Sequence, residues 1–396
     1  MNKSMKLGLV GYRGMVGSVL LKRMLEEKDF LNIDPIFFST TNKGNTAPNI
    51  GKDIPLVQDS FDLKLLEDCD IIINCQGKAY THKIYSKLRR KWQGYWIDAS
   101  SALRMQNNVI LSLDPINLSH IQKGLKKGIK TFSGANCTVS LMLLALHGLF
   151  KENLVEWVST MTYQAVSGAG AGQMKELAQQ IKYLNNKIST ENSSDPLKWE
   201  QQINHVLKEN DFPQQELIHP LSYNLHPWID DLLENGQSKE EWKGSAEGNK
   251  ILCSPKTISI DGTCVRIPTL RCHCQAMTIK LTKNIPLNEL TQIIDSANPW
   301  TFVVPNTKKE TLKHLTPVAI SNSLSIPVGR LRKMSMGNKF LNAFSVGDQL
   351  LWGAAEPLRR TFKIIQYYKK RKSFLDLPIN ISINHSLNEY HENKTI

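Results

Sequence analysis

Cys137 stands at a position where a cysteine could act as a nucleophile. It follows Gly134-Ala135-Asn136 and lies between the predicted strand 130–133 and a helical pattern of apolar residues over 141–149. The N-terminus of a helix, alone or with nearby cations, lowers the pKa of a thiol, and the thiolate is the attacking species. We therefore predict a nucleophilic Cys137 with a lowered pKa. From these residues alone, the alternative is a small buried side chain.

His273 and Arg266 are the second pair of candidates. They are seven residues apart, so an unbroken strand would point their side chains to opposite faces. Pro268 lies between them and permits a break that would let both reach one site. His273 has the residue type of a general acid or base, and the alternative is a structural histidine held by hydrogen bonds. Cys272 and Cys274 beside it lack a second ligand pair with zinc-like spacing, so we expect no metal.

Four further polar residues lie at strand ends or on one helix face. Arg104 comes shortly after the apolar strand 95–98, and Gln164 ends a strand before the glycine-rich turn 167–172. Ligands of α/β sheets bind at such strand ends. Glu240 and Lys243 are three residues apart in a segment of helical composition, so they share a face. The alternative for this pair is a solvent-facing ion pair that contributes little.

The glycine-rich loop GYRGMVG, residues 11–17, lies between the first predicted strand and the first predicted helix. Such glycines let the backbone approach a pyrophosphate at a helix N-terminus; the alternative is a tight turn that binds nothing. An NAD site usually places a carboxylate about 20 residues further on. Thr40 and Thr41 stand there instead, with Lys43 beyond them and Arg13 in the loop. Hydroxyls and cations can hold a 2′-phosphate, so we predict NADP.

The elements that carry this loop alternate between strand and helix patterns. Val16, Leu20 and Met24 recur at helical spacing directly after the glycines. Strands separated by helical segments predict βαβ units and a parallel sheet covered on both faces. The expected strands are Leu7–Val10, Pro35–Thr40, Asp70–Cys75, Tyr95–Asp98, Val109–Leu113 and Lys130–Ser133.

Beyond Thr138 the pattern changes, and a second sheet of more antiparallel character is expected. Pro357 should kink or divide the last predicted helix. The Asn- and Ser-rich stretch Asn185–Asp195 indicates a surface connection. The expected strands are Trp157–Ala165, Ile251–Ile260 and Val265–Leu281, and the expected helices are Met174–Tyr183 and Gln349–Arg360.

Composition indicates a folded protein of two domains in a reducing compartment. The chain has 396 residues, 41% of them hydrophobic, and domains average roughly 100–200 residues. No apolar run approaches the ~20 residues that span a bilayer, and the first residues predict a strand and turn rather than a signal peptide. Seven scattered cysteines do not form a disulfide scaffold. We therefore expect a cytoplasmic protein without a membrane partner.

The formal net charge of +13 suggests an acidic partner. One dense cluster of cations, Lys369–Lys372, precedes an Asn-rich end of the chain, and we expect the tail 369–396 to be poorly ordered. A basic surface around phosphate-bearing small molecules explains the charge, and the alternative is a nucleic-acid-binding module. The sequence contains no RNA-recognition or helix-turn-helix signature, so no nucleic-acid partner is expected.

Taken together, the motifs resemble those of aspartate-semialdehyde dehydrogenases of the Gram-negative bacterial type. The resemblance covers nearly the whole chain, from about Met5 to about Ile365. It implies an α/β fold: a Rossmann-type dinucleotide-binding domain over 1–136 and an α+β catalytic and dimerisation domain over 137–349. A helix at 350–368 would pack back on the first domain, and the protein would be a homodimer. The matching segments are GYRGMVGSVL, FFSTT, CQGKAYT, GYWIDAS, SGANCTVSLML, TYQAVSGAGA, EEWKG, RCHCQAMTIKL and VGDQLLWGAAEPLRR.

The same resemblance implies a reaction and a role for each candidate. The enzyme would reduce L-aspartyl 4-phosphate to L-aspartate 4-semialdehyde with NADPH through a cysteine thioester, reversibly, in the pathway to lysine and diaminopimelate, threonine and methionine. Cys137 would be the nucleophile, His273 the acid/base, and Gln164 would orient the substrate. Arg266 would hold the substrate carboxylate and Glu240 its amino group, while the phosphate would bind Arg104, Asn136 and Lys243. NADP would contact Arg13, Gly14, Met15, Val16, Thr40, Thr41, Gln76, Ser167, Gly168 and Gln349.

The nearest alternatives among enzymes are N-acetyl-glutamyl-phosphate reductase and glyceraldehyde-3-phosphate dehydrogenase, which share the pairing of cysteine with histidine. Glu240 together with Arg266 favours a free amino acid, because an acetyl cap would neutralise the amine that Glu240 is expected to bind.

Overall fold

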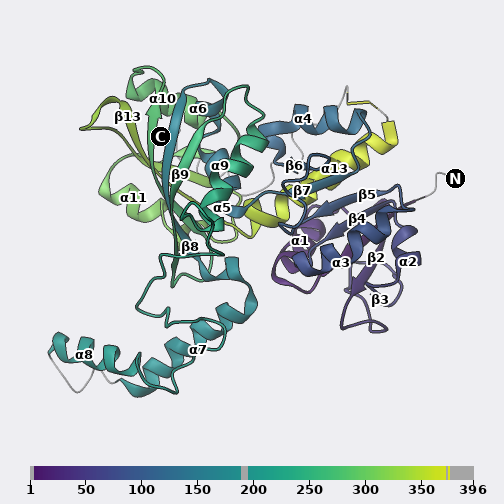
Figure 1. The fold of residues 1–396 in the computed structure, drawn as a ribbon, viewed down its shortest axis with the longest axis horizontal. Helices are drawn as coiled ribbons and strands as arrows, with labels where there is room; N and C mark the ends of the chain where they lie inside the picture. Colours follow the sequence, from purple (N-terminus) through teal and green to yellow (C-terminus); the bar gives the residue numbers. More distant parts are fainter. Residues whose placement is uncertain (1–3, 189–194, 372, 375–396) are drawn as a thin grey trace.

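The computed structural model describes residues 4–188, 195–371, 373 and 374. Its strands form one sheet of seven strands and one of six. Figure 1 shows the two sheets in separate halves of the molecule, and the yellow C-terminal helix runs back across the first half. The site described below lies where these halves meet.

The seven-stranded sheet is parallel throughout. Its order is β3-β2-β1-β4-β5-β7-β6, so the direction in which strands are added reverses between β1 and β4. Open α/β sheets bind ligands outside the carboxyl ends of the strands at such a reversal. The strands are β1 (Met5–Val10), β2 (Ile33–Ser39), β3 (Gln58–Asp59), β4 (Ile71–Asn74), β5 (Tyr95–Asp98), β6 (Ile110–Ser112) and β7 (Thr131–Gly134).

The sequence of these elements explains their places. β4 reads Ile-Ile-Ile-Asn and is buried throughout, as a strand covered on both faces must be. The first helix buries Leu20 and Met24 of the predicted stripe, with Gly17 beside them. All six predicted strands are present, and only the short β3 was not predicted. The helices of this half are α1 (Met15–Glu26), α2 (Leu63–Glu67), α3 (Lys78–Arg89) and α4 (Asp114–Lys126).

The six-stranded sheet is mixed, with the order β11-β12-β13-β10-β8-β9. Its three central pairings are antiparallel and its two edge pairings are parallel. The strands are β8 (Val155–Ala165), β9 (Ser259–Ile267), β10 (His273–Leu281), β11 (Thr301–Val303), β12 (Ile326–Met334) and β13 (Gly337–Gly347).

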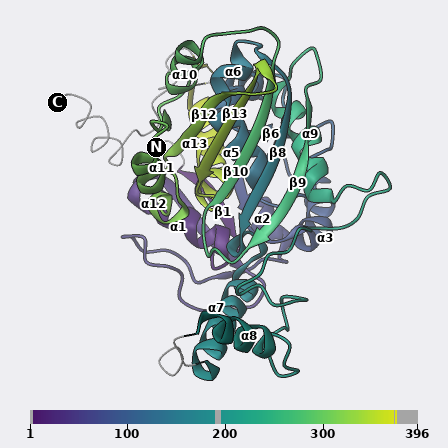
Figure 2. The same cartoon turned by 90° about the vertical axis from the view of Figure 1, so that its left-hand side faces the viewer.

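Helices cover one face of this sheet. They are α5 (Cys137–Ala145), α9 (Lys239–Leu252) and α10 (Leu287–Asp295), while α6 (His147–Lys151) packs on α10. Figure 2 turns the opposite face toward the viewer, with the strands in front of the helices. The predicted domain boundary at residue 136 falls between β7 of the first sheet and β8 of the second.

Three predictions for the second half are wrong in detail. Ile251 and Leu252 are the last two residues of α9, so the strand expected at 251–260 begins only at Ser259. The span 265–281 contains two strands, because β9 ends at Ile267 and β10 begins at His273. The helix predicted over 141–149 is interrupted at Leu146. Residues 138–145 are buried on every face, so an amphipathic period could not mark its end.

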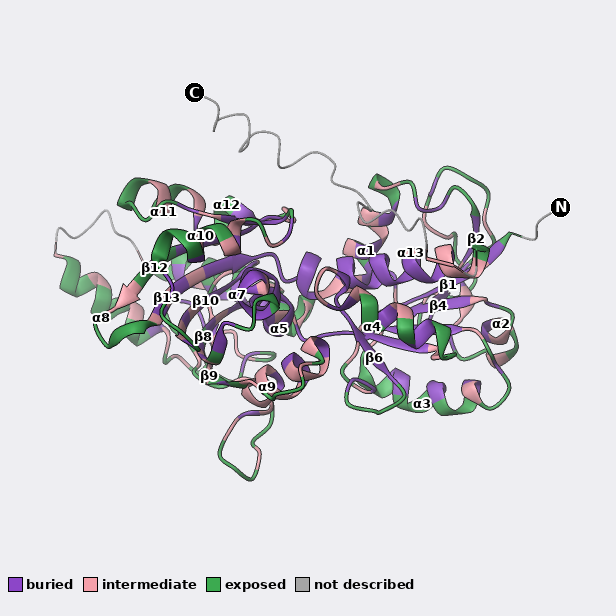
Figure 3. Ribbon diagram, turned by 90° about the horizontal axis from the view of Figure 1, so that it is seen from above, coloured by how far each residue is buried: buried purple, intermediate pink, exposed green. Residues whose placement is uncertain are grey.

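The chain returns to the first half through a π-helical turn, Leu351–Ala355, and α13 (Glu356–Arg371). Pro357 is the second residue of α13, so the helix predicted over 349–360 is divided into the π-helical turn and the start of α13 next to this proline. The Arg360 guanidinium donates to Asp114 at 2.6–2.9 Å and lies 4.8 Å from the Trp300 ring. These contacts attach α13 to both halves, and Figure 3 shows much of the helix buried.

The remaining helices lie on the second half. α7 (Ala171–Lys187) and α8 (Pro196–Val206) extend away from it in Figure 1, and the others are α11 (Lys308–His314), α12 (Pro317–Ile320) and the 3-10 turn Val166–Ala169. Among the described residues, none of the helices is both long and apolar enough to cross a bilayer. Of the predicted tail, 369–371 end α13, whereas 372 and 375–396 lie outside the described residues, as does most of the connection 185–195.

Candidate active site

Cys137 is the first residue of α5, shortly after the end of β7. Asn136 caps this helix: its Oδ1 accepts hydrogen bonds from the backbone N–H groups of Thr138 at 2.9 Å and Val139 at 3.3 Å. Such a cap fixes the first turn of the helix. The nucleophile candidate therefore lies at the strand-to-helix junction, as predicted.

His273 lies directly beside this cysteine. Its Nε2 is 3.3 Å from the Sγ of Cys137, and its Nδ1 accepts a 3.0 Å hydrogen bond from the backbone N–H of Ala165. Because Nδ1 is an acceptor, the neutral ring carries its proton on Nε2, next to the sulfur. Burial, together with the Arg266 guanidinium, lowers the pKa of His273 to about 3. The ring is therefore a neutral hydrogen-bond donor to the sulfur.

The expected lowering of the thiol pKa is wrong for the free enzyme. Burial, with the Glu240 carboxylate, raises the pKa of Cys137 to about 12. Arg266, Arg104 and Lys243 act in the opposite direction but do not outweigh burial. The sequence showed the helix N-terminus but not the depth of the site, so the free enzyme holds a neutral thiol beside a neutral imidazole.

Arg266 reaches the same site from the neighbouring strand. β8 and β9 are parallel, and Gln164 is paired in register with Arg266. The Arg266 Nη1 donates to the backbone oxygen of Ala165 at 2.8 Å. A Cβ on Gly168 would lie 3.2 Å from both Arg266 Nη1 and His273 Cε1, so these two side chains meet at this glycine. The break near Pro268 thus brings them together, as predicted.

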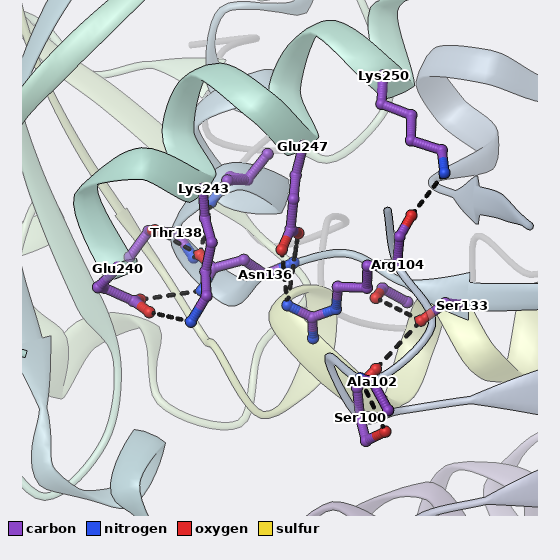
Figure 4. Close-up of polar contacts among 12 residues, drawn as sticks. Ser100, Ala102, Arg104, Ser133, Asn136, Thr138, Glu240, Lys243, Glu247 and Lys250 are labelled. Carbon is purple, nitrogen blue, oxygen red and sulfur yellow. Dashed lines mark hydrogen bonds and ion pairs between the residues drawn. The ribbon is translucent and has the colours of Figure 1, made fainter. Parts of the chain in front are cut away.

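One face of α9 carries the charged residues of the site (Figure 4). Glu240 accepts hydrogen bonds from Asn136 Nδ2 at 2.9 Å, Gln164 Nε2 at 3.2 Å and Lys243 Nζ at 2.9 Å. Burial alone would raise the pKa of Glu240, but these partners lower it below its usual value. Both side chains of the pair are buried, so the solvent-facing alternative is wrong.

Two carboxylates that the sequence analysis did not single out complete this cluster. Asp230 accepts a 2.7 Å hydrogen bond from Lys243 Nζ, so the ammonium lies between Asp230 and Glu240. Glu247 accepts from Arg104 Nη1 at 3.1 Å. Glu247 is four residues after Lys243, and helical spacing could have indicated it. Asp230 lies in an irregular loop and has no such signal in the sequence.

A cavity of about 710 Å³ joins these charges to the glycine loop, within the usual size range for small-molecule sites. Its wall includes Cys137, Arg104, Arg266, Lys243 and Glu240. Of the residues predicted to bind the cofactor, those in the wall are Met15, Val16, Ser167, Gly168 and Gln349. The cavity can therefore hold a ligand in contact with both the nucleophile and the loop.

The other residues predicted to bind the cofactor, Arg13, Gly14, Thr40, Thr41 and Gln76, lie outside this wall. Gln76 Nε2 donates to Thr40 Oγ1 at 3.3 Å, which joins the residues after β2 and β4 on either side of β1. This is the place where the strand order reverses. These residues are therefore at the expected edge of the sheet, although not in the main cavity.

The glycine loop has the geometry that a dinucleotide phosphate needs. Gly11 has a φ of +75°, and a Cβ on Gly17 would lie 2.2 Å from the Gly11 oxygen. Gly14 caps α1 without a side-chain hydrogen bond, which leaves the first N–H groups of the helix available to an anion.

Asp59 of β3 lies beside Ser39 and forms an ion pair with Lys43 at 3.1 Å. This carboxylate has no clear signal in the sequence, because β3 is only two residues long.

Comparison with known families gives this site a context. The model of the semialdehyde dehydrogenase NAD-binding domain matches residues 6–124, and the model of the semialdehyde dehydrogenase dimerisation domain matches residues 146–352. The chain belongs to the semialdehyde dehydrogenase family. This dehydrogenase therefore combines a Rossmann-type NAD-binding domain with a dimerisation domain, and the predicted α/β fold and enzyme class are confirmed.

Solved structures of similar proteins agree with this family assignment. The dehydrogenase is 47% identical to aspartate semialdehyde dehydrogenase from Francisella tularensis, with a TM-score of 0.89, over 91% of this chain and all of that one. Aspartate semialdehyde dehydrogenase II from Vibrio cholerae, complexed with ASA, is 22% identical with a TM-score of 0.76, over 92% and 99% of the two chains. The enzyme from Candida albicans, solved with NADP, is 14% identical with a TM-score of 0.61, over 92% and 99%. The latter two share its fold.

Proposed function

We propose that this dehydrogenase interconverts L-aspartyl 4-phosphate and L-aspartate 4-semialdehyde, with NADP as cofactor and a thioester on Cys137. One observation carries the proposal: a single cavity is lined by Cys137, two arginines and Lys243 and reaches the start of α1, and His273 lies 3.3 Å behind the Cys137 sulfur. The aspartate semialdehyde dehydrogenase from Francisella tularensis, 47% identical, supports this substrate.

The acyl-transfer step uses the thiol and the cations. The Sγ of Cys137 bonds to the acyl carbon, the bond from that carbon to the phosphate oxygen breaks, and the thiol proton leaves with the phosphate. Arg104 and Lys243 match the charge of the departing phosphate. Division of the reaction at a thioester replaces one difficult step by two easier ones.

His273 serves this chemistry as a hydrogen-bond donor. Its Nε2–H faces the sulfur, so it stabilises the thiolate that forms when the aldehyde leaves. Its low pKa and the hydrogen bond from Ala165 to Nδ1 oppose a second proton on the ring. A neutral ring of this kind donates a hydrogen bond rather than its proton, so we propose that His273 acts by stabilising the negative charge on the sulfur. Loss of one positioned donor to a developing negative charge typically costs about 10²–10³-fold in kcat.

Substrate recognition falls to two buried charged side chains, Arg266 and Glu240. Arg266 binds the α-carboxylate, for which a guanidinium offers two parallel donors. Glu240 binds the α-ammonium, and the amides of Asn136 and Gln164 that donate to Glu240 hold its carboxylate in place. An acylated amine has no charge to offer Glu240, so the site favours a free amino acid over an N-acetylated substrate.

The cofactor site combines the first turn of α1 with Thr40, Thr41, Gln76 and Arg13. NADP would supply the nicotinamide that donates or accepts the hydride. The N–H groups after Gly14 would bind its pyrophosphate. Thr40 and Thr41 would hold the 2′-phosphate with their hydroxyl groups, and Lys43 pairs with the neighbouring carboxylate of Asp59.

The experiment is an assay of NADP reduction with aspartate semialdehyde and inorganic phosphate. We expect turnover that requires phosphate and stops after alkylation of Cys137, with NAD far less effective than NADP. N-acetyl-glutamate semialdehyde, tested in parallel, should not support turnover. Activity with the acetylated substrate alone would contradict the proposal and indicate the reductase of N-acetyl-glutamyl phosphate.

We also propose a homodimer through the open face of the six-stranded sheet. Alternate residues of β8 on this face remain partly or fully accessible, among them Trp157, Met161 and Tyr163. The Trp157 and Tyr163 rings pack beside Phe340 and Phe344 of β13, at 6.0 and 6.5 Å between centroids. Met161→Glu should convert the dimer to a monomer in light scattering. An unchanged dimer would contradict this interface.

The seven cysteines, all within the described residues, are free thiols. This fits the proposed location in the cytoplasm, where thiols remain reduced. The nucleic-acid alternative depends on Lys369–Lys372, of which Lys369 forms an ion pair with Asp70 at 2.6 Å. A basic surface that serves the substrate and cofactor phosphates remains our interpretation of the net charge, and binding of RNA that is lost on deletion of 369–396 would contradict it.

A further inference from the structure

Glu247 is a buried carboxylate to which the proposed reaction assigns no role. It lies on the same face of α9 as Glu240 and Lys243 and is 2% exposed. Its Oε1 accepts from Arg104 Nη1 at 3.1 Å, and its Oε2 accepts from the backbone N–H of Asn136 at 2.6 Å (Figure 4). One side chain thus joins α9, the loop after β5 and the start of α5.

We propose that Glu247 is a positioning residue for phosphate recognition. It fixes the guanidinium of Arg104 and the backbone of Asn136, so that the cation and the nucleophile that follows Asn136 face the same phosphate. This inference rests on the proposed function, because it assumes that a phosphate binds at Arg104. Glu247 itself touches neither the substrate nor the sulfur.

The hydrogen bonds of Arg104 show which N–H groups of its guanidinium remain available to a ligand. Nη1 is taken by Glu247, and Nη2 donates to the backbone oxygen of Ala99 at 3.2 Å. Nε is buried and has no hydrogen-bond partner among the described residues, while Arg104 lines the cavity. A buried donor without an acceptor is unfavourable unless a ligand supplies one. The Nε edge is therefore the part of the guanidinium that remains for an anion.

Asn136 is held from three directions. Its backbone N–H donates to Glu247, its Nδ2 donates to Glu240, and its Oδ1 caps α5. Rotation of this residue would break these bonds together, and Cys137 follows it directly. Glu247 therefore helps to fix both the anion-binding edge of Arg104 and the start of the helix that carries the nucleophile.

Glutamine cannot replace this carboxylate, although it has nearly the same shape. Both partners of Glu247 are donors, and a glutamine side chain offers one acceptor oxygen and one donor group. Either Arg104 or the N–H of Asn136 would then face a donor. Aspartate keeps two acceptors on a shorter side chain, so it should restore part of the function.

If Glu247 had a purely electrostatic role, its removal would change the KM for phosphate in the opposite direction. If Glu247 only neutralised Arg104, removal of its charge would strengthen phosphate binding and lower the KM for phosphate. If it positions Arg104, the same change should raise that KM. The direction of the change in KM for phosphate therefore separates the two roles.

The test measures semialdehyde oxidation by wild type, Glu247→Gln, Glu247→Asp and the control Glu241→Gln. Glu241 lies on the same helix but accepts from the backbone N–H groups of Ser238 and Cys264, away from Arg104. We expect Glu247→Gln to raise the KM for phosphate by about tenfold or more, with a smaller change in the KM for semialdehyde. Glu247→Asp should lie between it and wild type, and Glu241→Gln should keep the wild-type KM for phosphate.

An unchanged or lower KM for phosphate in folded Glu247→Gln would overturn the inference. Thermal unfolding of each variant reports whether it is folded, and Glu247→Asp carries the same test if Glu247→Gln does not fold. A wild-type enzyme without phosphate-dependent oxidation would instead overturn the proposed function. An active wild type with a normal Glu247→Gln would overturn this inference alone.

Discussion

Gly353 should control the position of the nucleophile, although it carries no functional group. It lies in the π-helical turn between β13 and α13, and a Cβ at this residue would lie 2.6 Å from the Cβ and 2.9 Å from the Cα of Cys137. Carbon atoms in contact are ~3.5–4.0 Å apart. Gly353→Ala therefore requires a shift of about 1 Å, and a displacement of that size costs roughly 10²-fold in rate.

The assay is steady-state oxidation of the semialdehyde, together with cofactor binding by fluorescence. We expect kcat of Gly353→Ala to fall by about a hundredfold, with little change in the Kd of the cofactor. Gly244→Ala is the matched control: Gly244 lies in α9, and its added methyl group would meet only Ile260, at the ordinary distance of 3.4 Å. If Gly353→Ala kept a kcat within a factor of about two of wild type, the proposed fit between the π-helical turn and the nucleophile would be wrong.

Three further predictions concern His273, the thiol and the cofactor. His273→Asn should lower kcat by more than about a hundredfold with little change in KM; a nearly normal kcat would remove its catalytic role. Because the thiol pKa is raised to about 12, alkylation of Cys137 in the free enzyme should accelerate about tenfold per pH unit between about pH 6 and 9, and a plateau in that range would show a lowered pKa instead. Thr40→Asp should shift preference from NADPH toward NADH, since a carboxylate repels the 2′-phosphate; unchanged discrimination would contradict the proposed site.

The parallel sheet and the glycine loop could be predicted because they depend on local signals. Continuous apolar runs such as Ile71–Asn74 mark buried strands, and the glycines of 11–17 mark the turn between the first strand and its helix. The strands of the second sheet were harder to predict from the sequence. Its strands pair over long distances in the sequence. α5 is buried on every face, so periodicity did not give its end, and the apolar end of α9 at Ile251 and Leu252 resembled the start of the next strand.

The candidate site shows the same division. Cys137, His273 and Arg266 stand in recognisable local contexts, and the break near Pro268 explained how the last two could meet. The pKa of Cys137 could not be predicted, because it depends on burial by segments far along the chain. Glu247 and Ala165 act through hydrogen bonds to Arg104 and His273, over 143 and 108 residues of sequence, and only the fold reveals these contacts.

The most direct test of the thioester is to offer the enzyme L-aspartyl 4-phosphate without reduced cofactor. We expect release of one equivalent of phosphate per active site and a hydroxylamine-sensitive aspartyl group on the peptide that contains Cys137, with neither in the Cys137→Ala variant. Phosphate release without modification of this peptide, or turnover by Cys137→Ala, would show that the reaction does not proceed through this cysteine.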